Sequence, residues 1–161
     1  MLIEITGPTG AGKTLCSAGL VEALRKNNPD LIFVHGETPG GDVDAALPDY
    51  ILDTTKHNVK TDLYLLPSFV MFCFFQIDFV IFALQIILKV ADNRLSLFRS
   101  FLRKAALYRL FTGRKYKNRC VVMDEGLFHT AHNLLVHVGT DVTKRVVHKF
   151  ATLCPKPDHL V

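Results

Sequence analysis

The sequence predicts an α/β fold of three layers, in which helices cover both faces of a parallel β-sheet. Short apolar runs that suit buried strands alternate along the chain with segments of helical periodicity. The first apolar run also leads directly into a glycine-rich turn that opens a helix. Strands that alternate with helices pair in parallel, because each helix returns the chain to the starting edge of the sheet. With 161 residues, 49% of them apolar, the chain suits a single domain over residues 1–161.

The elements follow in order from local patterns. Residues 2–5 form a short buried strand, residues 13–26 a helix that Asn27-Asn28-Pro29 ends, and residues 31–34 a second strand. The polar stretch 35–49, rich in glycine and proline, is a loop. A third strand then ends in "CVVMD", and helices cover 127–138 and a stretch that ends near Leu153. The final "PKPDHLV" is a turn into a fourth strand, so we expect a truncated chain that lacks its last strands and a carboxyl-terminal lid.

Residues 63–90 are strongly apolar and raise the question of a membrane span. A span needs about 20 predominantly apolar residues, whereas Asp78 divides this segment into uncharged windows of fifteen and ten residues. We therefore favour one long helix that starts near Ser68, is buried on most sides by its own domain, and precedes a second helix over 93–111. Together, residues 62–112 form a helical insertion. Docking of this helical pair on a membrane surface, or on an acidic partner, stays open as an alternative.

Basic residues concentrate between positions 89 and 119. Ten lysines and arginines face one acid there, although the whole chain carries a net charge of only +4. Such a block favours an anionic partner, either a peripheral membrane surface or an acidic protein. Nucleic acid is not expected, because aromatic residues are sparse in the block and no DNA- or RNA-binding module is recognisable. Four dispersed cysteines and the lack of a signal peptide indicate a cytoplasmic protein, with membrane association as the open alternative.

The stretch "GPTGAGKT" matches the pattern G-x-x-x-x-G-K-[ST], with Gly7, Gly12, Lys13 and Thr14 at the fixed positions. Glycines allow the backbone to point its N–H groups inward, and the helix that follows adds a partial positive charge at its amino end. Such a loop holds polyphosphate, with the lysine on the outer phosphates and the threonine hydroxyl on Mg²⁺. The predicted nucleotide-binding residues are Gly7, Pro8, Thr9, Gly10, Ala11, Gly12, Lys13, Thr14 and Leu15.

A phosphate-binding loop of this kind needs an acid at the end of a neighbouring strand to position Mg²⁺. The third strand supplies it, since four apolar residues precede Asp124 and Glu125. We expect Asp124 to reach the metal together with Thr14. Glu125 is then placed to polarise a water molecule or an acceptor hydroxyl.

With "HGETPGG" after the second strand, these motifs make the chain resemble the P-loop NTPase superfamily, and within it the nucleoside and nucleotide kinases that include thymidylate kinases. The resemblance implies that Glu37, with Gly40 and Gly41, faces the phosphate acceptor, as a base or as a partner for a sugar hydroxyl. One departure concerns the third strand. Those kinases usually place an arginine after the acid there, whereas this chain has Glu125 and Gly126.

The expected function is therefore transfer of the terminal phosphoryl group of ATP, with Mg²⁺, to a small hydroxylated acceptor, with Lys13, Glu125 and Glu37 as the catalytic residues. A regulatory ATPase that docks a partner or membrane is the alternative, and nucleotide binding without chemistry is a third reading. No D-x-x-G follows the third strand, which disfavours a GTPase. A metal site on His129, His132 and His137 is disfavoured, because these histidines lack a ligand-spaced motif such as H-E-x-x-H.

Overall fold

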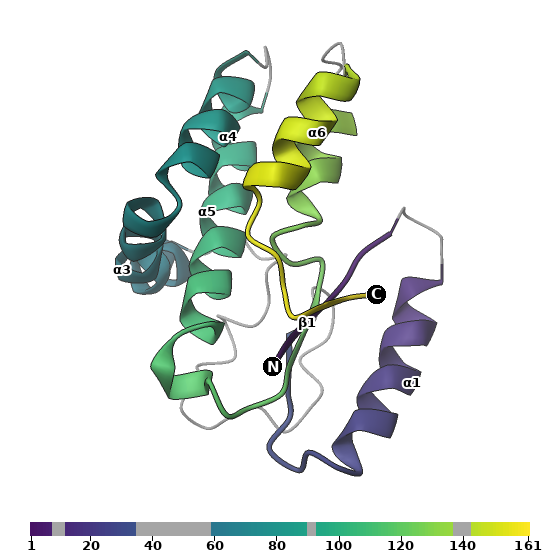
Figure 1. The fold of residues 1–161 in the computed structure, drawn as a ribbon. Coiled ribbons are helices and arrows are strands. Elements are labelled where there is room, and N and C mark those ends of the chain that lie inside the picture. The colour runs from purple at the N-terminus through teal and green to yellow at the C-terminus, as the bar shows by residue number, and fades with distance from the viewer. Residues whose placement is uncertain (8–11, 35–58, 90–92, 137–142) are drawn as a thin grey trace.

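The computed structural model describes residues 1–7, 12–34, 59–89, 93–136 and 143–161, and it has a mixed α/β architecture (Figure 1). Four strands in this part of the chain form one sheet, in the order β2-β3-β1-β4, and every neighbouring pair is parallel. The strands are β1 (Leu2–Ile5), β2 (Ile32–Val34), β3 (Val121–Asp124) and β4 (His159–Leu160). The predicted α/β class with a parallel sheet is confirmed, and so is the short fourth strand.

Helices lie on both faces of the sheet (Figure 1). Alternate strand residues point to opposite faces, so Ile3 and Ile5 pack with Val122 and with Val21 of α1 (Lys13–Arg25) on one face. The other face carries a larger core formed with the remaining helices. These helices are α3 (Val59–Phe75), α4 (Ile77–Lys89), α5 (Arg94–Phe111) and α6 (Lys144–Leu153), with a 3₁₀ turn, η1 (Arg114–Tyr116), after α5.

The predicted long helix from Ser68 is wrong, because the segment forms two helices. α3 already begins at Val59, contains Pro67, and is followed by α4 at a bend of 109°. The bend lets Phe72 of α3 and Phe79 of α4 meet edge to face, with ring centroids 6.3 Å apart, over the same core. No single helix among the described residues meets the length and hydropathy criteria for crossing a membrane, although the bent pair meets them when taken together.

Burial of the two helices also differs from the prediction. α4 is buried along much of its length, whereas α3 buries only four of its 17 residues. The helix predicted over 93–111 is confirmed as α5, and its Leu95 is 70% exposed near the amino end.

The helix predicted over 127–138 is present only in part. Residues 127–129 form a bend and a turn, residues 130–131 are helical, and a π-helix, η2 (His132–Val136), follows them, whereas residues 137–138 lie outside the described part of the chain. The turns place the backbone N–H of His129 on the buried Glu4 carboxylate, at 2.8 Å from Oε1. A buried strand carboxylate therefore determines how this segment leaves the sheet, because the charge needs donors where water is excluded.

The strand order creates a topological switch point at the carboxyl ends of β1 and β3. From β1 the chain passes through α1 to β2 at one edge of the sheet, whereas from β3 it passes through α6 to β4 at the other edge. The two central strands thus send their connections in opposite directions. In open α/β sheets, ligands bind outside the carboxyl ends of the strands at such a switch point.

Candidate functional site

The glycine loop begins at the carboxyl end of β1 and leads into α1. Gly12 caps α1 in the left-handed region, at φ 76°, where residues with a Cβ are strained. The N–H groups of Leu15 and Cys16 both donate to the Gly12 carbonyl at 3.1 Å. α1 therefore starts at Lys13, and the free N–H groups of the first turn of a helix favour an anion at that end.

Several predicted site residues lie outside the description. The described residues do not include Pro8, Thr9, Gly10 and Ala11 of the glycine loop. They also do not include Glu37, Gly40 and Gly41 of the predicted acceptor loop. Thr14 is described only in its backbone, as part of α1. The side chain of Leu15 is 82% exposed on α1.

Lys13 joins the two predicted motifs across 112 residues of sequence. Its Nζ donates to the Gly7 carbonyl at 2.8 Å and to Glu125 Oε1 at 3.2 Å. The side chain is only 13% exposed, so it is largely shielded from solvent. A cation is thus held at the point where the loop and β3 meet.

The acidic pair lies directly beside this lysine. Asp124 pairs with Ile5 in the parallel register of β3 and β1, and it is buried. Glu125 follows in the left-handed region, at φ 60°, and its N–H donates to the Ile5 carbonyl at 3.2 Å. A positive φ is unusual for a residue that has a side chain. In Glu125 it occurs together with the hydrogen bond that the carboxylate accepts from Lys13.

Charges around Glu125 keep it ionised. Burial would raise the pKa of Glu125, but electrostatic interactions with His129 first, and then with Lys104 and Lys13, lower it by more. The pKa therefore lies below the ordinary value for a glutamate. A carboxylate that is ionised at neutral pH can accept a proton or hold a hydroxyl, which are the roles predicted for Glu125.

Gly126, the departure from the kinase pattern, has a steric explanation. A Cβ at this position would lie 2.7 Å from Cδ and 2.8 Å from Oε2 of Glu4. Glu4 lies in the middle of β1 and is 1% exposed. Burial raises its pKa, although the backbone N–H groups of residues 127–129 and the charge of Lys104 oppose that rise. A larger residue after Glu125 would have to displace this buried carboxylate.

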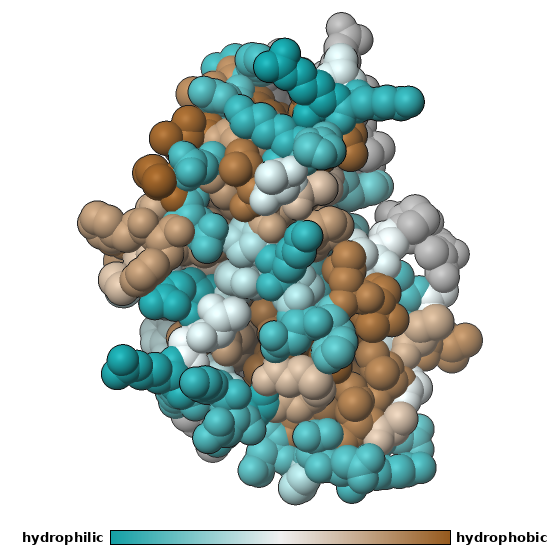
Figure 2. All heavy atoms as spheres, in the orientation of Figure 1, coloured by the Kyte–Doolittle hydropathy of each residue, from teal (hydrophilic) through white to brown (hydrophobic). Residues whose placement is uncertain are grey.

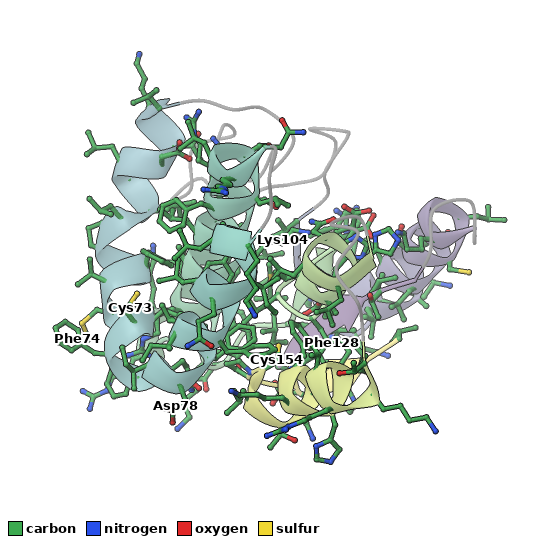
Figure 3. All side chains as sticks on the ribbon, turned by 90° about the horizontal axis from the view of Figure 1, so that it is seen from above. Cys73, Phe74, Asp78, Lys104, Phe128 and Cys154 are labelled. Atoms are coloured by element: carbon green, nitrogen blue, oxygen red, sulfur yellow. The ribbon has the colours of Figure 1, made fainter. Side chains whose placement is uncertain are left out.

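Lys104 is a site residue that the sequence interpretation missed. It extends from α5 on the side turned away from α3 (Figure 3), is 6% exposed, and interacts electrostatically with Glu125, Glu4 and Asp124. Burial lowers its pKa to about 8, against the opposing effect of these three acids. In the sequence it looks like one more member of the basic block. The sequence feature that indicates a buried cation is Glu4, because a carboxylate in an apolar strand needs a cation nearby.

His129 borders the site as a neutral imidazole. Its Nε2 lies 3.8 Å from Glu125 Oε1, and its Nδ1 is buried without a hydrogen-bond partner among the described residues. Burial, followed by the charge of Lys104, lowers its pKa to about 4. His137 lies outside the described residues, and within them no group of three histidine, cysteine or acidic side chains is placed to hold a metal.

Two arginines of α5 bind one acid of α3. Arg99 Nη2 and Arg103 Nε both lie 2.6 Å from the Asp62 carboxylate. Burial would raise the pKa of Asp62, but the two guanidinium groups lower it by more. This cluster joins α3 to α5.

Comparisons of the chain with protein-family models, with curated proteins and with solved structures found no match.

Proposed function

We propose that the chain is a P-loop phosphotransferase, which binds ATP with Mg²⁺ at the switch point and transfers the terminal phosphoryl group to a small hydroxylated acceptor. The acceptor class is a nucleoside, a nucleotide or a sugar-like molecule. The observation that carries the proposal is the position of Lys13, whose Nζ contacts both the Gly7 carbonyl and the Glu125 carboxylate where β1 and β3 end side by side. Loop, lysine, helix amino end and acid converge there, as polyphosphate binding requires.

The donor set suits Mg²⁺. Asp124 offers hard carboxylate oxygen at the end of the strand next to the loop, and Mg²⁺ is typically held by one or two carboxylates together with phosphate oxygens and water. Such a site does not need three protein ligands, so the lack of a three-residue cluster among the described residues does not count against it. Asp124 and the Thr14 hydroxyl would hold the ion, which would neutralise charge on the phosphates.

The chain's own groups then divide the work. Lys13 would exchange its contact with Glu125 for the outer phosphates, because a polyanion is the stronger partner for an ammonium. That exchange would release the Glu125 carboxylate to orient or deprotonate the acceptor hydroxyl. Lys104 adds a second, buried positive charge close to the acids, where it would oppose the build-up of negative charge during transfer. Glu37 stays the predicted acceptor-side residue by resemblance.

A regulatory ATPase is the second candidate, favoured by the exposed apolar side chains of α3, which suit a docking partner. In that case Glu125 would orient water instead of an acceptor hydroxyl. The chemistry of the site is the same, and only the nucleophile differs.

Labelled ATP separates the two. The protein is incubated with γ-labelled ATP, Mg²⁺ and pools of nucleosides, nucleotides and sugars, and label is followed into acceptor or into free phosphate. Transfer to an acceptor supports the kinase, and phosphate release alone supports the ATPase. Lys13→Ala should reduce either activity by about 10²–10³-fold, whereas Lys26→Ala, at the exposed end of α1, should not. Undiminished activity in Lys13→Ala would show that the site is assigned wrongly.

A further inference from the structure

The outer side of α3 is as apolar as its inner side. Large apolar side chains project from it at helical spacing over its whole length, and Figure 2 shows apolar surface over α3 and α4. They are Val59, Leu63, Tyr64, Leu66, Val70, Met71, Phe74 and Phe75, and we call them the α3 outer face. Phe74 is 77% exposed and points away from the rest of the molecule (Figure 3). Contiguous apolar surface of this kind marks an interaction site.

The inner side of α3 is fixed, so the helix cannot turn to hide its outer face. Phe69 meets Phe98 and Phe101 of α5 edge to face, at centroid distances of 6.1 and 6.0 Å. Asp62, at the amino end of α3, holds both Arg99 and Arg103. Rolling the helix would break a buried aromatic cluster and leave the buried Arg103 without its carboxylate, which is strongly unfavourable.

Positive charge borders this surface. The guanidinium of Arg109 lies 4.6 Å from the centre of the Phe75 ring, and Phe75 is itself 63% exposed. Lys89 ends α4 in an exposed position. The two helices contain two acids. Asp62 is bound to Arg99 and Arg103, and Asp78 is exposed at the bend, where lipid headgroups rather than acyl chains would lie. An apolar face with a basic border complements an anionic lipid surface.

We propose that the α3 outer face docks on the surface of an anionic lipid bilayer, with the aromatic residues at the α3–α4 bend entering the boundary between headgroups and acyl chains. The 109° bend keeps α3 lying along the surface instead of crossing it. Self-association through the same face is the competing outcome. It is disfavoured because it would bring the basic residues of two copies together, whereas anionic lipid neutralises them.

The chain contains no tryptophan, so Phe74→Trp introduces a unique fluorophore at the most exposed point of the α3 outer face. With vesicles that contain phosphatidylserine, its emission should shift to the blue and be quenched by brominated acyl chains. Val147→Trp, on an exposed position of α6, is the matched control and should stay unchanged. Emission of Phe74→Trp that does not respond to these vesicles would overturn the proposal.

Co-sedimentation of the full chain supplies the second readout. Val70→Ser/Phe74→Ser/Phe75→Ser should lower the vesicle partition coefficient by about 100-fold. Its circular dichroism spectrum should stay unchanged. Arg109→Gln should weaken binding several-fold and reduce its salt dependence. Equal binding to pure phosphatidylcholine, or a wild-type dimer that the triple variant dissociates without any vesicle binding, would contradict docking on anionic lipid.

Discussion

Two regions of the molecule reverse the usual rule that charged side chains are exposed and apolar ones buried. They are the candidate site at the carboxyl edge of the sheet and the α3 outer face. At the candidate site the structure buries charge, with Glu4, Asp124 and Lys104 all under a tenth exposed. On α3 it exposes large apolar side chains. Both arrangements are unfavourable for an isolated molecule, since buried ions and solvent-exposed apolar surface each raise its free energy. The difference fits the two proposals made above, in which a polyanion neutralises the charges in one region and an anionic lipid surface covers the apolar side chains in the other.

The largest expected effect contrasts two phenylalanines two residues apart on α3. Phe72 is 1% exposed and meets Phe79 and Tyr108 edge to face, whereas Phe74 is 77% exposed. Phe72→Ala should lower the free energy of unfolding by about 3–5 kcal/mol, and Phe74→Ala should change it by less than about 0.5 kcal/mol. Urea denaturation followed by circular dichroism measures both. Equal losses would mean that the α3 outer face packs against the chain itself.

The next effect concerns the buried ammonium of Lys104. Its pKa is about 8 in the folded protein, against an ordinary value of 10.5. Between these values the unfolded chain binds more protons than the folded one, so stability should rise with pH across this window, by up to about 3 kcal/mol. Lys104→Met should abolish that rise and also reduce phosphoryl transfer. Denaturation midpoints of both proteins from pH 7 to about pH 10 test this, and identical pH profiles would place Lys104 in contact with solvent.

A smaller effect separates two glycines. Gly126→Ala would place a Cβ against the buried Glu4 carboxylate and should cost about 2 kcal/mol of stability. Gly19→Ala, in α1, meets nothing within 4 Å and should stabilise the protein by about 0.5–1 kcal/mol. Thermal denaturation compares the two. If Gly126→Ala lowers stability as much in a Glu4→Ala background, where the carboxylate is absent, as it does in the wild type, the steric explanation fails.

Much of the fold follows from patterns that the sequence displays locally. The strand at residues 2–5, the helix after the loop and the acid-terminated third strand were each predicted from a handful of neighbouring residues, and the structure places Lys13 and Glu125 in contact. Their meeting follows from the pairing of β1 with β3. Parallel pairing brings the carboxyl ends of strands to one edge, whatever their separation in sequence.

What could not be predicted depends on contacts between distant segments. The bend between α3 and α4 brings Phe72 and Phe79 into one core, a contact that no window of apolar residues reveals. Lys104 sits among basic neighbours in the sequence, yet α5 carries it to the candidate site while Arg103, the adjacent residue, binds Asp62. A count of charges cannot separate these two roles, because one helix presents them in different directions.

Titration calorimetry with ATP and Mg²⁺ tests the central claim most directly, that the amino end of α1 and Lys13 form a binding site for polyphosphate. We expect the wild type and Lys26→Ala to bind ATP with the same affinity, and Lys13→Ala to bind it about 100-fold more weakly while staying folded. A wild-type protein that binds neither ATP nor GTP in the presence of Mg²⁺, or a Lys13→Ala variant with unchanged affinity, would contradict the account.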